Sequence, residues 1–249
     1  MRFLWIMLTA FCSTGLASAG ISRPVNDQRA VVRVIHGESN GSGFVVGQAK
    51  GVALVLTSNH VLNSGQKIIC VQFGQLGFEA RVVNLQIHGK DMALLYVPIP
   101  KGKSINELGI SYKAPRVGDE ITAMGYDRKG NFLQRSGTVK LTLAKPLEDG
   151  YDLGTTADLE KGMSGGPMIN ELGKVVAVNS THSEPLWEQD LLYEGGGKVD
   201  ADLNLAIAKL SMGVSIASHD RLILDNARDN IKKPLLPNAK SPKQCRRVK

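Results

Sequence analysis

The sequence predicts an all-β protein with one helix near its C-terminal end, and three observations predict this class. Hydrophobic residues make up 43% of the 249 residues while aromatic residues make up only 5%, a balance that suits valine- and leucine-rich strands. Short β-prone runs recur along the chain and are separated by glycine, asparagine or proline. A chain of about 230 residues, the length left after removal of a leader, is long enough to form two packed units.

The predicted strands fall into two sets of six, on either side of a connector near residues 98–115. Each run is rich in the residue types that favour a pleated, half-buried surface. The first set covers residues 31–35, 43–47, 53–57, 67–73, 79–85 and 92–97. The second set covers residues 119–125, 134–143, 152–156, 166–170, 174–179 and 204–207.

Two other segments depart from this strand pattern. Residues 182–201 contain proline, tryptophan, acidic residues and three consecutive glycines, which predicts a long surface loop. Such a loop either influences access to a neighbouring site or is a neutral insertion. Residues 220–233 carry apolar side chains at helical spacing, end in two lysines and precede Pro234, which predicts an amphipathic helix. We expect this helix to pack on the back of the second set of strands.

A serine set among glycines, in the segment 162–167, is the leading candidate for a nucleophile. A serine hydroxyl is a weak nucleophile at neutral pH, so Ser164 needs an imidazole to take its proton and a carboxylate to orient that imidazole. His60 and Asp91 are the candidates, because each lies at the edge of an apolar run. In the alternative, purely structural interpretation, His60 is a strand-end residue, Asp91 is a turn residue or a cap, and Ser164 is a turn residue.

The chain order His, Asp, Ser separates this sequence from the α/β-hydrolases and from subtilisin-like enzymes. With that order, the sequence resembles the trypsin-like, chymotrypsin-fold serine peptidases, and especially their bacterial envelope branch with its high-temperature-requirement proteases. The resemblance spans roughly residues 30 to 215. The segments that carry it are 41–46, 57–62, 91–97, 162–167, 173–180 and 203–207.

This resemblance implies two packed six-stranded antiparallel β-barrels, chymotrypsin-like, followed by a C-terminal helix. It divides the chain into an N-terminal barrel over 20–112, a C-terminal barrel over 113–215, and a helix with a basic tail over 216–249. The active site would lie between the barrels. The residues after the second barrel are too few and too polar for the PDZ domain that high-temperature-requirement proteases normally carry, so we expect none.

The resemblance also implies roles for individual residues. His60, Asp91 and Ser164 would form a triad that hydrolyses peptide bonds through an acyl-enzyme, without a cofactor. The backbone N–H groups of Gly162 and Ser164 would form the oxyanion hole. We expect no metal, because the pair of His88 and Asp91 has no accompanying histidine or cysteine cluster.

Met163 departs from the family pattern. Trypsin-like zymogens carry an acidic residue at this position, which pairs with the newly cut N-terminus. Methionine cannot form that ion pair, so we do not expect activation by N-terminal insertion. Met163 instead either fills an apolar gap beneath the loop or leaves the oxyanion hole unformed. The second case gives an alternative function, a latent or inactive peptidase-like binding or scaffold protein.

Substrate specificity has three open interpretations. Asp158 lies six residues before Ser164, where trypsin-like enzymes place the carboxylate that receives Arg or Lys. The pocket could instead be apolar and lined by segments 178–181 and 203–206, or Asp158 could be solvated on a turn. The candidate substrate-binding residues are Asp158, Val178, Asn179, Ser180 and Leu205.

The first residues predict export. A basic start, an apolar run over 3–11 and the sequence Ala17-Ser18-Ala19 are typical of a signal peptide over residues 1–19. The apolar run is short for a membrane span, so we expect no stable membrane insertion after cleavage. The mature protein would be periplasmic or secreted, and its partner would be a polypeptide substrate. The sequence makes no prediction of the oligomeric state.

Two cysteines, Cys70 and Cys245, remain after the leader. An oxidising compartment permits a disulfide between them, whereas two thiols far apart in the fold could not meet, and both possibilities stay open. The formal net charge of +7 comes in part from lysines and arginines in the last twenty residues or so. This basic tail has no interleaved aromatic residues and no nucleic-acid motif, so we expect no nucleic-acid partner.

Overall fold

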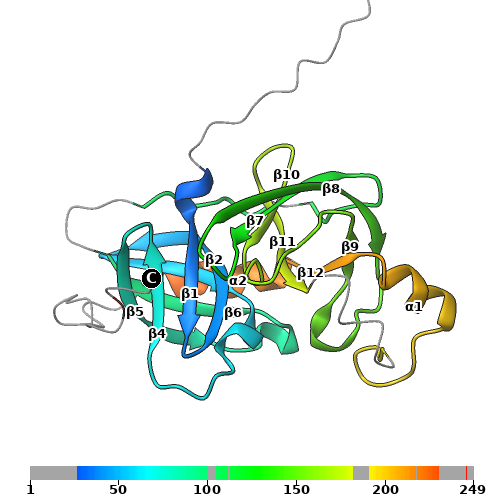
Figure 1. Cartoon of the computed structure of the whole chain (residues 1–249), viewed down its shortest axis with the longest axis horizontal. Coiled ribbons are helices and arrows are strands. Elements are labelled where there is room, and N and C mark those ends of the chain that lie inside the picture. The colour runs from blue at the N-terminus through cyan, green and yellow to red at the C-terminus, as the bar shows by residue number, and fades with distance from the viewer. Residues whose placement is uncertain are drawn as a thin grey trace, which may run out of the picture.

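The computed structural model describes residues 27–99, 105–111, 113–181, 191–216, 218–229 and 245. Its strands form two closed six-stranded barrels that lie side by side (Figure 1), and every strand pair is antiparallel. The predicted all-β class and the two-barrel architecture are therefore confirmed. The predicted leader over 1–19 lies outside the described residues.

The first barrel has the strand order β1-β2-β3-β6-β5-β4. Alternate side chains point inward and form its core, which includes Val34, Val55 and Leu95. All six runs expected in this half of the chain are strands. They are β1 (Val31–His36), β2 (Ser39–Ala49), β3 (Val52–Thr57), β4 (Ile69–Phe73), β5 (Leu76–Asn84) and β6 (Ala93–Pro98).

The second barrel has the order β10-β11-β12-β9-β8-β7 and a core that includes Ile121, Val139 and Ala177. Five of its six strands lie where the sequence predicts them. The strands are β7 (Glu120–Tyr126), β8 (Phe132–Thr142), β9 (Leu153–Thr155), β10 (Pro167–Asn170), β11 (Val175–Thr181) and β12 (Ser211–Ser215).

The prediction of a strand over 204–207 is wrong, because this segment belongs to helix α1 (Ala201–Ile207). Asp200 caps the helix by accepting a hydrogen bond from the Leu203 N–H at 2.9 Å. The apolar residues of the segment alternate as in a strand, and the cap decides in favour of the helix. The last strand is instead β12, which pairs with both β11 and β9.

The predicted C-terminal helix is confirmed as α2 (Ser218–Asp229), and residues 230–233 of the predicted range lie outside the described residues. Its main strand contact is with β2 of the first barrel, whereas the expectation was the back of the second barrel. The helix contacts β2, and the Tyr96 hydroxyl of β6 donates to the carbonyl oxygen of Ala227 at 2.8 Å. Ile223 and Ala227 pack into a cluster that includes Val46 of β2. The chain therefore returns to the first barrel after completing the second.

A disulfide joins Cys70 of β4 to Cys245, which is 175 residues further along the chain. The sequence left open whether these two cysteines pair, and the structure shows that they do. The bond ties Cys245 to the first barrel. Cys245 is fully buried, and the carbonyl of this residue lies so close to Gly77 that a Cβ there would come within 1.8 Å of its oxygen.

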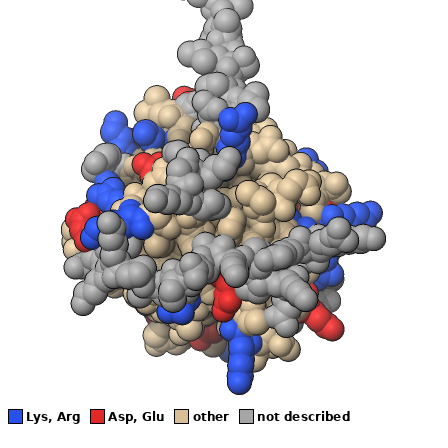
Figure 2. Space-filling model, turned by 90° about the vertical axis from the view of Figure 1, so that its left-hand side faces the viewer, with Lys and Arg blue, Asp and Glu red and all other residues tan. Residues whose placement is uncertain are grey.

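Basic side chains are spread over the end of the first barrel. Figure 2 shows this face, with Lys and Arg scattered around its rim among Asp and Glu. In the described part of this face, the basic residues are scattered and do not line a single groove. Among the described residues, no helix has the length and hydrophobicity needed to cross a membrane.

Candidate active site

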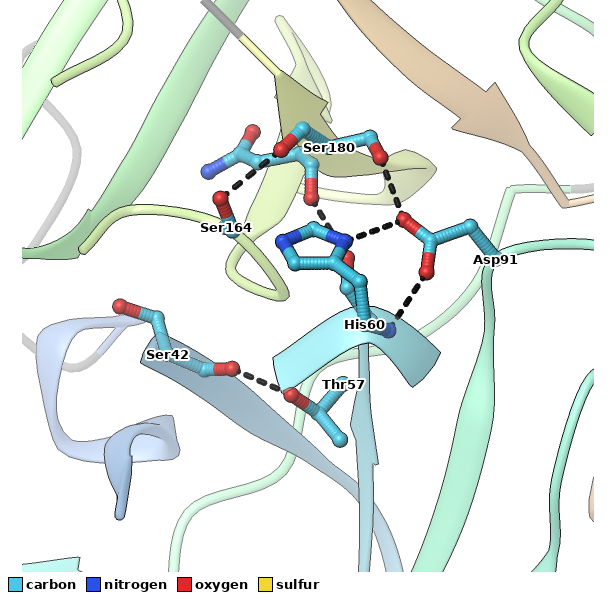
Figure 3. Close-up of polar contacts among 8 residues, drawn as sticks. Ser42, Thr57, His60, Asp91, Ser164 and Ser180 are labelled. Atoms are coloured by element: carbon cyan, nitrogen blue, oxygen red, sulfur yellow. Dashed lines mark hydrogen bonds and ion pairs between the residues drawn. The ribbon is translucent and has the colours of Figure 1, made fainter. Parts of the chain in front are cut away.

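His60 and Asp91 meet at one edge of the first barrel. His60 lies in a short 3-10 helix (Asn59–Leu62) just after β3, and Asp91 lies just before β6. Because β3 and β6 are antiparallel neighbours, with Thr57 opposite Ala93, the two residues come out at the same end. His60 Nδ1 lies 2.7 Å from Asp91 Oδ2, and the His60 backbone N–H donates to Oδ1 at 2.8 Å (Figure 3).

The second barrel brings Ser164 to this pair, in the loop that precedes β10. Its hydroxyl donates to the carbonyl oxygen of Ser180 at 2.8 Å, whereas no hydrogen bond to His60 is present among the described residues. The Ser180 hydroxyl in turn donates to Asp91 Oδ2 at 2.5 Å. Ser180 of β11 therefore contacts both Ser164 and Asp91 (Figure 3).

Asp91 is 3% exposed, while the side chain of His60 is 43% exposed. The carboxylate is held by the two His60 donors and by Ser180, and its own backbone N–H donates to the Asp149 carbonyl at 2.6 Å. This arrangement presents an accessible imidazole backed by a buried, well-bonded carboxylate. Such a carboxylate fixes the tautomer of the ring and stabilises its protonated form.

Tyr151 is a neighbour of Asp91 that the sequence did not reveal. Its side chain lies within interaction range of the Asp91 carboxylate and of Ser180. Burial and the Asp91 carboxylate raise the pKa of the Tyr151 phenol well above its usual value. No local signal in the sequence points to this tyrosine, because it reaches Asp91 from the second barrel.

Gly162 has a backbone conformation that favours glycine, with φ of +106°. A Cβ at this position would come within 2.7 Å of the Tyr126 carbonyl oxygen and 2.8 Å of the Arg128 nitrogen. Among the described residues, the backbone N–H groups of Gly162 and Ser164 have no hydrogen-bond acceptor. The glycine thus allows a turn in which both N–H groups are available.

Ser42 of β2 holds the serine loop from the first barrel. Its hydroxyl donates to the Gly162 carbonyl at 2.8 Å and accepts a hydrogen bond from the Tyr126 N–H at 2.8 Å. Its backbone N–H donates to the Ser164 carbonyl at 2.7 Å. Ser42 lies within the segment 41–46 that resembles the peptidase family, but the sequence does not reveal its role, because its partners are distant in the chain.

Met163 is fully buried in the core of the second barrel, in a cluster that contains Leu159 and Met168. The interpretation that Met163 fills an apolar gap beneath the loop is confirmed. Asn179 supports the same loop, since its side-chain amide donates to the carbonyls of Met124 and Met163 at 2.9 and 3.1 Å. The serine loop is therefore fixed from below without an ion pair at position 163.

The remaining candidate residues do not converge on one pocket. Asp158 is exposed, as the solvated-turn interpretation expects, and is not a buried carboxylate at a pocket floor. Val178 is a fully buried core residue opposite Pro167, and Asn179 lies beneath the serine loop. Leu205 is 65% exposed on α1 and is not on a strand beside Ser180. Within the described residues, no cluster of three or more His, Cys, Asp or Glu could hold a metal ion.

Two barrels with a His–Asp pair on one and a glycine-flanked serine on the other define the double-barrel serine peptidase class. A family model described as trypsin-like peptidase domain matches residues 41–178. The chain belongs to this trypsin-like peptidase family.

Individual relatives agree with this family. The chain is 30% identical over 165 residues to the periplasmic pH-dependent serine endoprotease DegQ of Escherichia coli, covering 65% of this chain and 33% of DegQ. It is 32% identical over 149 residues to the periplasmic serine endoprotease DegP of Salmonella typhimurium, covering 58% of this chain and 30% of DegP. The match thus spans about a third of each relative.

Among solved structures, a serine endoprotease from Yersinia pestis superposes with a TM-score of 0.58 at 20% identity. This superposition covers 82% of the present chain and 65% of the other. At that identity the likeness shows the fold alone.

Proposed function

We propose that this protein is an exported serine endopeptidase that cleaves polypeptides through His60, Asp91 and Ser164. The observation that supports this most strongly is the 2.7 Å pairing of His60 Nδ1 with a buried Asp91, next to a serine loop from the other barrel. Membership of the trypsin-like peptidase family supports peptide-bond hydrolysis as the reaction. The endoprotease activity in the names of DegQ and DegP supports an internal bond as its target.

The reaction begins with a change of partner by the Ser164 hydroxyl. In the substrate-free geometry this hydroxyl donates to the Ser180 carbonyl, so it must rotate toward Nε2 of His60 before attack. His60 then takes the proton as Ser164 Oγ attacks the peptide carbonyl, and Asp91 stabilises the resulting imidazolium. Catalytic hydrogen bonds are often long or misaligned without substrate, which agrees with this order of events.

The N–H groups of Gly162 and Ser164 stabilise the oxyanion that forms on the attacked carbonyl. The tetrahedral intermediate collapses as His60 donates its proton to the leaving amine, which leaves an acyl group on Ser164 Oγ. Water, deprotonated by the same imidazole, then hydrolyses the ester. Because both N–H groups lack an acceptor among the described residues, the loop supplies these donors without first breaking a bond.

The site of action follows from the leader and the disulfide. Residues 1–19 have the pattern of a cleaved signal peptide, and the Cys70–Cys245 bond requires an oxidising compartment. The relatives DegQ and DegP are both named as periplasmic. We therefore propose that the mature protein acts outside the cytoplasm, in the periplasm or the medium.

One observation favours the second candidate, a latent peptidase-like binding protein. The Ser164 hydroxyl donates to Ser180 and not to His60, as expected of a serine that is not activated. In this alternative, the protein binds extended polypeptides beside His60 and Ser164 without cleaving them.

A proteolysis assay separates the two candidates. Protein lacking residues 1–19 is incubated with an unfolded polypeptide, beside Ser164→Ala and His60→Ala variants. The peptidase proposal predicts cleavage that falls by at least about a thousandfold in each variant, since triad residues act as a unit. Ser136→Ala, an exposed serine on the outer face of β8, is the control and should cleave normally. Equal cleavage by Ser164→Ala would rule out the proposed mechanism, and binding without cleavage would favour the latent protein.

A further inference from the structure

Lys90 directly precedes Asp91 in the chain, and its side chain crosses from the first barrel to the second barrel and to α2. Its ammonium lies 2.9 Å from Asp220 Oδ2 of α2 and donates to the Ser215 carbonyl of β12 at 3.3 Å. The side chains of Lys90 and Asp220 are only 12% and 2% exposed. This ion pair is thus buried, in contrast to the exposed pairs of the molecule, and it begins one residue from the candidate triad.

Three further contacts surround this crossing point. The Asp152 carboxylate accepts a hydrogen bond from the Ser215 N–H at 2.7 Å, so Asp152 and Lys90 hold the two backbone groups of one residue. The aliphatic stem of Lys90 packs so closely on Gly150 that a Cβ there would come within 2.6 Å of Lys90 Cγ. The Asp149 carbonyl beside it accepts the Asp91 N–H at 2.6 Å.

The backbone around Lys90 forms a tight turn closed by hydrogen bonds. Contacts that fix the Lys90 side chain therefore also restrict the position of Asp91. The Lys90 N–H donates to the Ile87 carbonyl, and the Met92 N–H donates to the Lys90 carbonyl at 2.7 Å. Such a turn leaves little freedom between an anchored lysine and the next residue. Catalysis is sensitive to such anchoring, because small displacements of a reacting group are costly.

We propose that Lys90 is a positioning residue that fixes Asp91 against His60 by joining the catalytic edge of the first barrel to β12 and α2. Three observations support this role. The Lys90 ammonium is held by Asp220 and by the Ser215 carbonyl, the backbone turn around Lys90 is closed by hydrogen bonds, and the next residue is the triad carboxylate Asp91. The buried pair also gives α2 a function, since the helix carries the carboxylate that receives Lys90. This proposal rests on the proposed peptidase function, in which Asp91 orients His60.

Two roles of Lys90 can be told apart at the hydrogen bond between His60 Nδ1 and Asp91 Oδ2, which is 2.7 Å long. If Lys90 positions Asp91, its removal weakens this hydrogen bond. If Lys90 only stabilises the fold, a folded variant keeps the hydrogen bond intact. The NMR resonance of the His60 Nδ1 proton reports the state of this bond.

The test is the NMR resonance of the His60 Nδ1 proton in Lys90→Met, together with kcat and KM on a polypeptide substrate. We expect this resonance to move upfield, as it does when a hydrogen bond weakens, and kcat to fall by on the order of tenfold or more. KM should be unchanged, because only an interaction that matters in the transition state is lost. An unchanged resonance in a folded variant would overturn the proposal and leave Lys90 a structural residue.

Lys90→Met removes the Lys90 ammonium from the buried Asp220 carboxylate and risks unfolding, so a second variant is needed. The double variant Lys90→Met/Asp220→Leu replaces the buried pair by apolar side chains, which proteins often tolerate. It should fold, still shift the resonance of the His60 Nδ1 proton and still lower kcat. A double variant with wild-type values of both would also overturn the proposal.

The matched control is Arg228→Met/Asp225→Leu, which removes an exposed pair on the same helix with a separation of 3.4 Å. It should leave the resonance of the His60 Nδ1 proton and kcat unchanged. The NMR measurement needs no turnover, so it separates failure of this proposal from failure of the proposed function. If wild-type protein shows no cleavage but the resonance still moves upfield in Lys90→Met, the positioning role stands and the peptidase proposal fails.

Discussion

The Ser180 hydroxyl donates to Asp91 Oδ2 at 2.5 Å, and this hydrogen bond crosses from the second barrel to the first. It joins the strand beside Ser164 to the carboxylate behind His60. The position of Asp91 is therefore determined by both barrels. Catalysis should depend on the contact of Asp91 with Ser180 as well as on its contact with His60.

Ser180→Ala tests this relationship. The variant removes the hydroxyl and keeps the carbonyl that Ser164 contacts. A hydrogen bond to a charged group contributes about 1.5–3 kcal/mol, so we expect kcat to fall by one to two orders of magnitude with KM unchanged. Steady-state kinetics on a peptide substrate measure both constants. A wild-type kcat would mean that the Ser180 hydroxyl contributes nothing to the position of Asp91.

Gly162→Ala should abolish most of the activity. Alanine is strained at φ of +106°, and its Cβ would clash with the Tyr126 carbonyl, so the N–H of residue 162 must turn away from the oxyanion. Loss of one such donor costs about 3–4 kcal/mol, or a factor of hundreds in kcat.

Gly118→Ala is the matched control for this variant. Gly118 has a similar φ of +98° but open space where a Cβ would lie, so it carries the backbone strain without the clash. Thermal unfolding of both variants separates strain from catalysis. Equal kcat values for the two variants would contradict the role assigned to Gly162.

Removal of the Cys70–Cys245 disulfide should destabilise the protein. The bond closes a loop over 175 residues of sequence, so Cys70→Ala/Cys245→Ala should lower the free energy of unfolding by about 3–5 kcal/mol. Urea denaturation of the form lacking residues 1–19 measures this difference. A reductant should shift the wild-type midpoint to that of the variant and leave the variant itself unaffected. A wild-type midpoint insensitive to reductant would contradict the expectation.

The fold should lose stability in alkali through Tyr151. Burial and the Asp91 carboxylate raise the pKa of this phenol above its ordinary value of 10.0. The folded protein therefore binds the phenol proton more tightly than the unfolded chain does. The associated stability is complete below about pH 10 and is lost as the pH rises toward the folded pKa.

Tyr151→Phe removes this titration. The free energy of unfolding, measured by urea denaturation at steps between about pH 9 and 11, should fall less steeply for the variant, by up to about 1.4 kcal/mol per pH unit. Some slope should remain, because burial also raises the pKa of Tyr96 and Tyr126. Identical slopes for variant and wild type would show that the Tyr151 phenol ionises in the folded state.

Most of the fold can be predicted from local pattern, and the exceptions have physical causes. Eleven of the predicted runs are strands, and each is a short β-prone run between turn-forming residues. The run at 204–207 is also short and apolar, yet the Asp200 cap makes it a helix. The amphipathic face of α2 is visible in the sequence, but the barrel that it covers is set by tertiary contacts such as that of Tyr96 with Ala227.

The candidate site divides in the same way. His60, Asp91 and Ser164 are recognisable because their residue types, chain order and neighbouring glycines are local properties. The residues that hold them, such as Ser42 and Lys90, act through partners far away in the sequence. Ser42 and its partner Gly162 are 120 residues apart, and Lys90 and its partner Asp220 are 130 residues apart. A local sequence pattern cannot reveal contacts over such separations.

The most direct test of the account is covalent labelling of Ser164 by a fluorophosphonate, which reacts with serines activated by a general base. The mature protein is labelled beside Ser164→Ala and His60→Ala, and mass spectrometry locates the adduct. We expect rapid labelling that is confined to Ser164 and absent from both variants. A folded wild-type protein that remains unlabelled, or is labelled equally in His60→Ala, would contradict the claim that His60 activates Ser164.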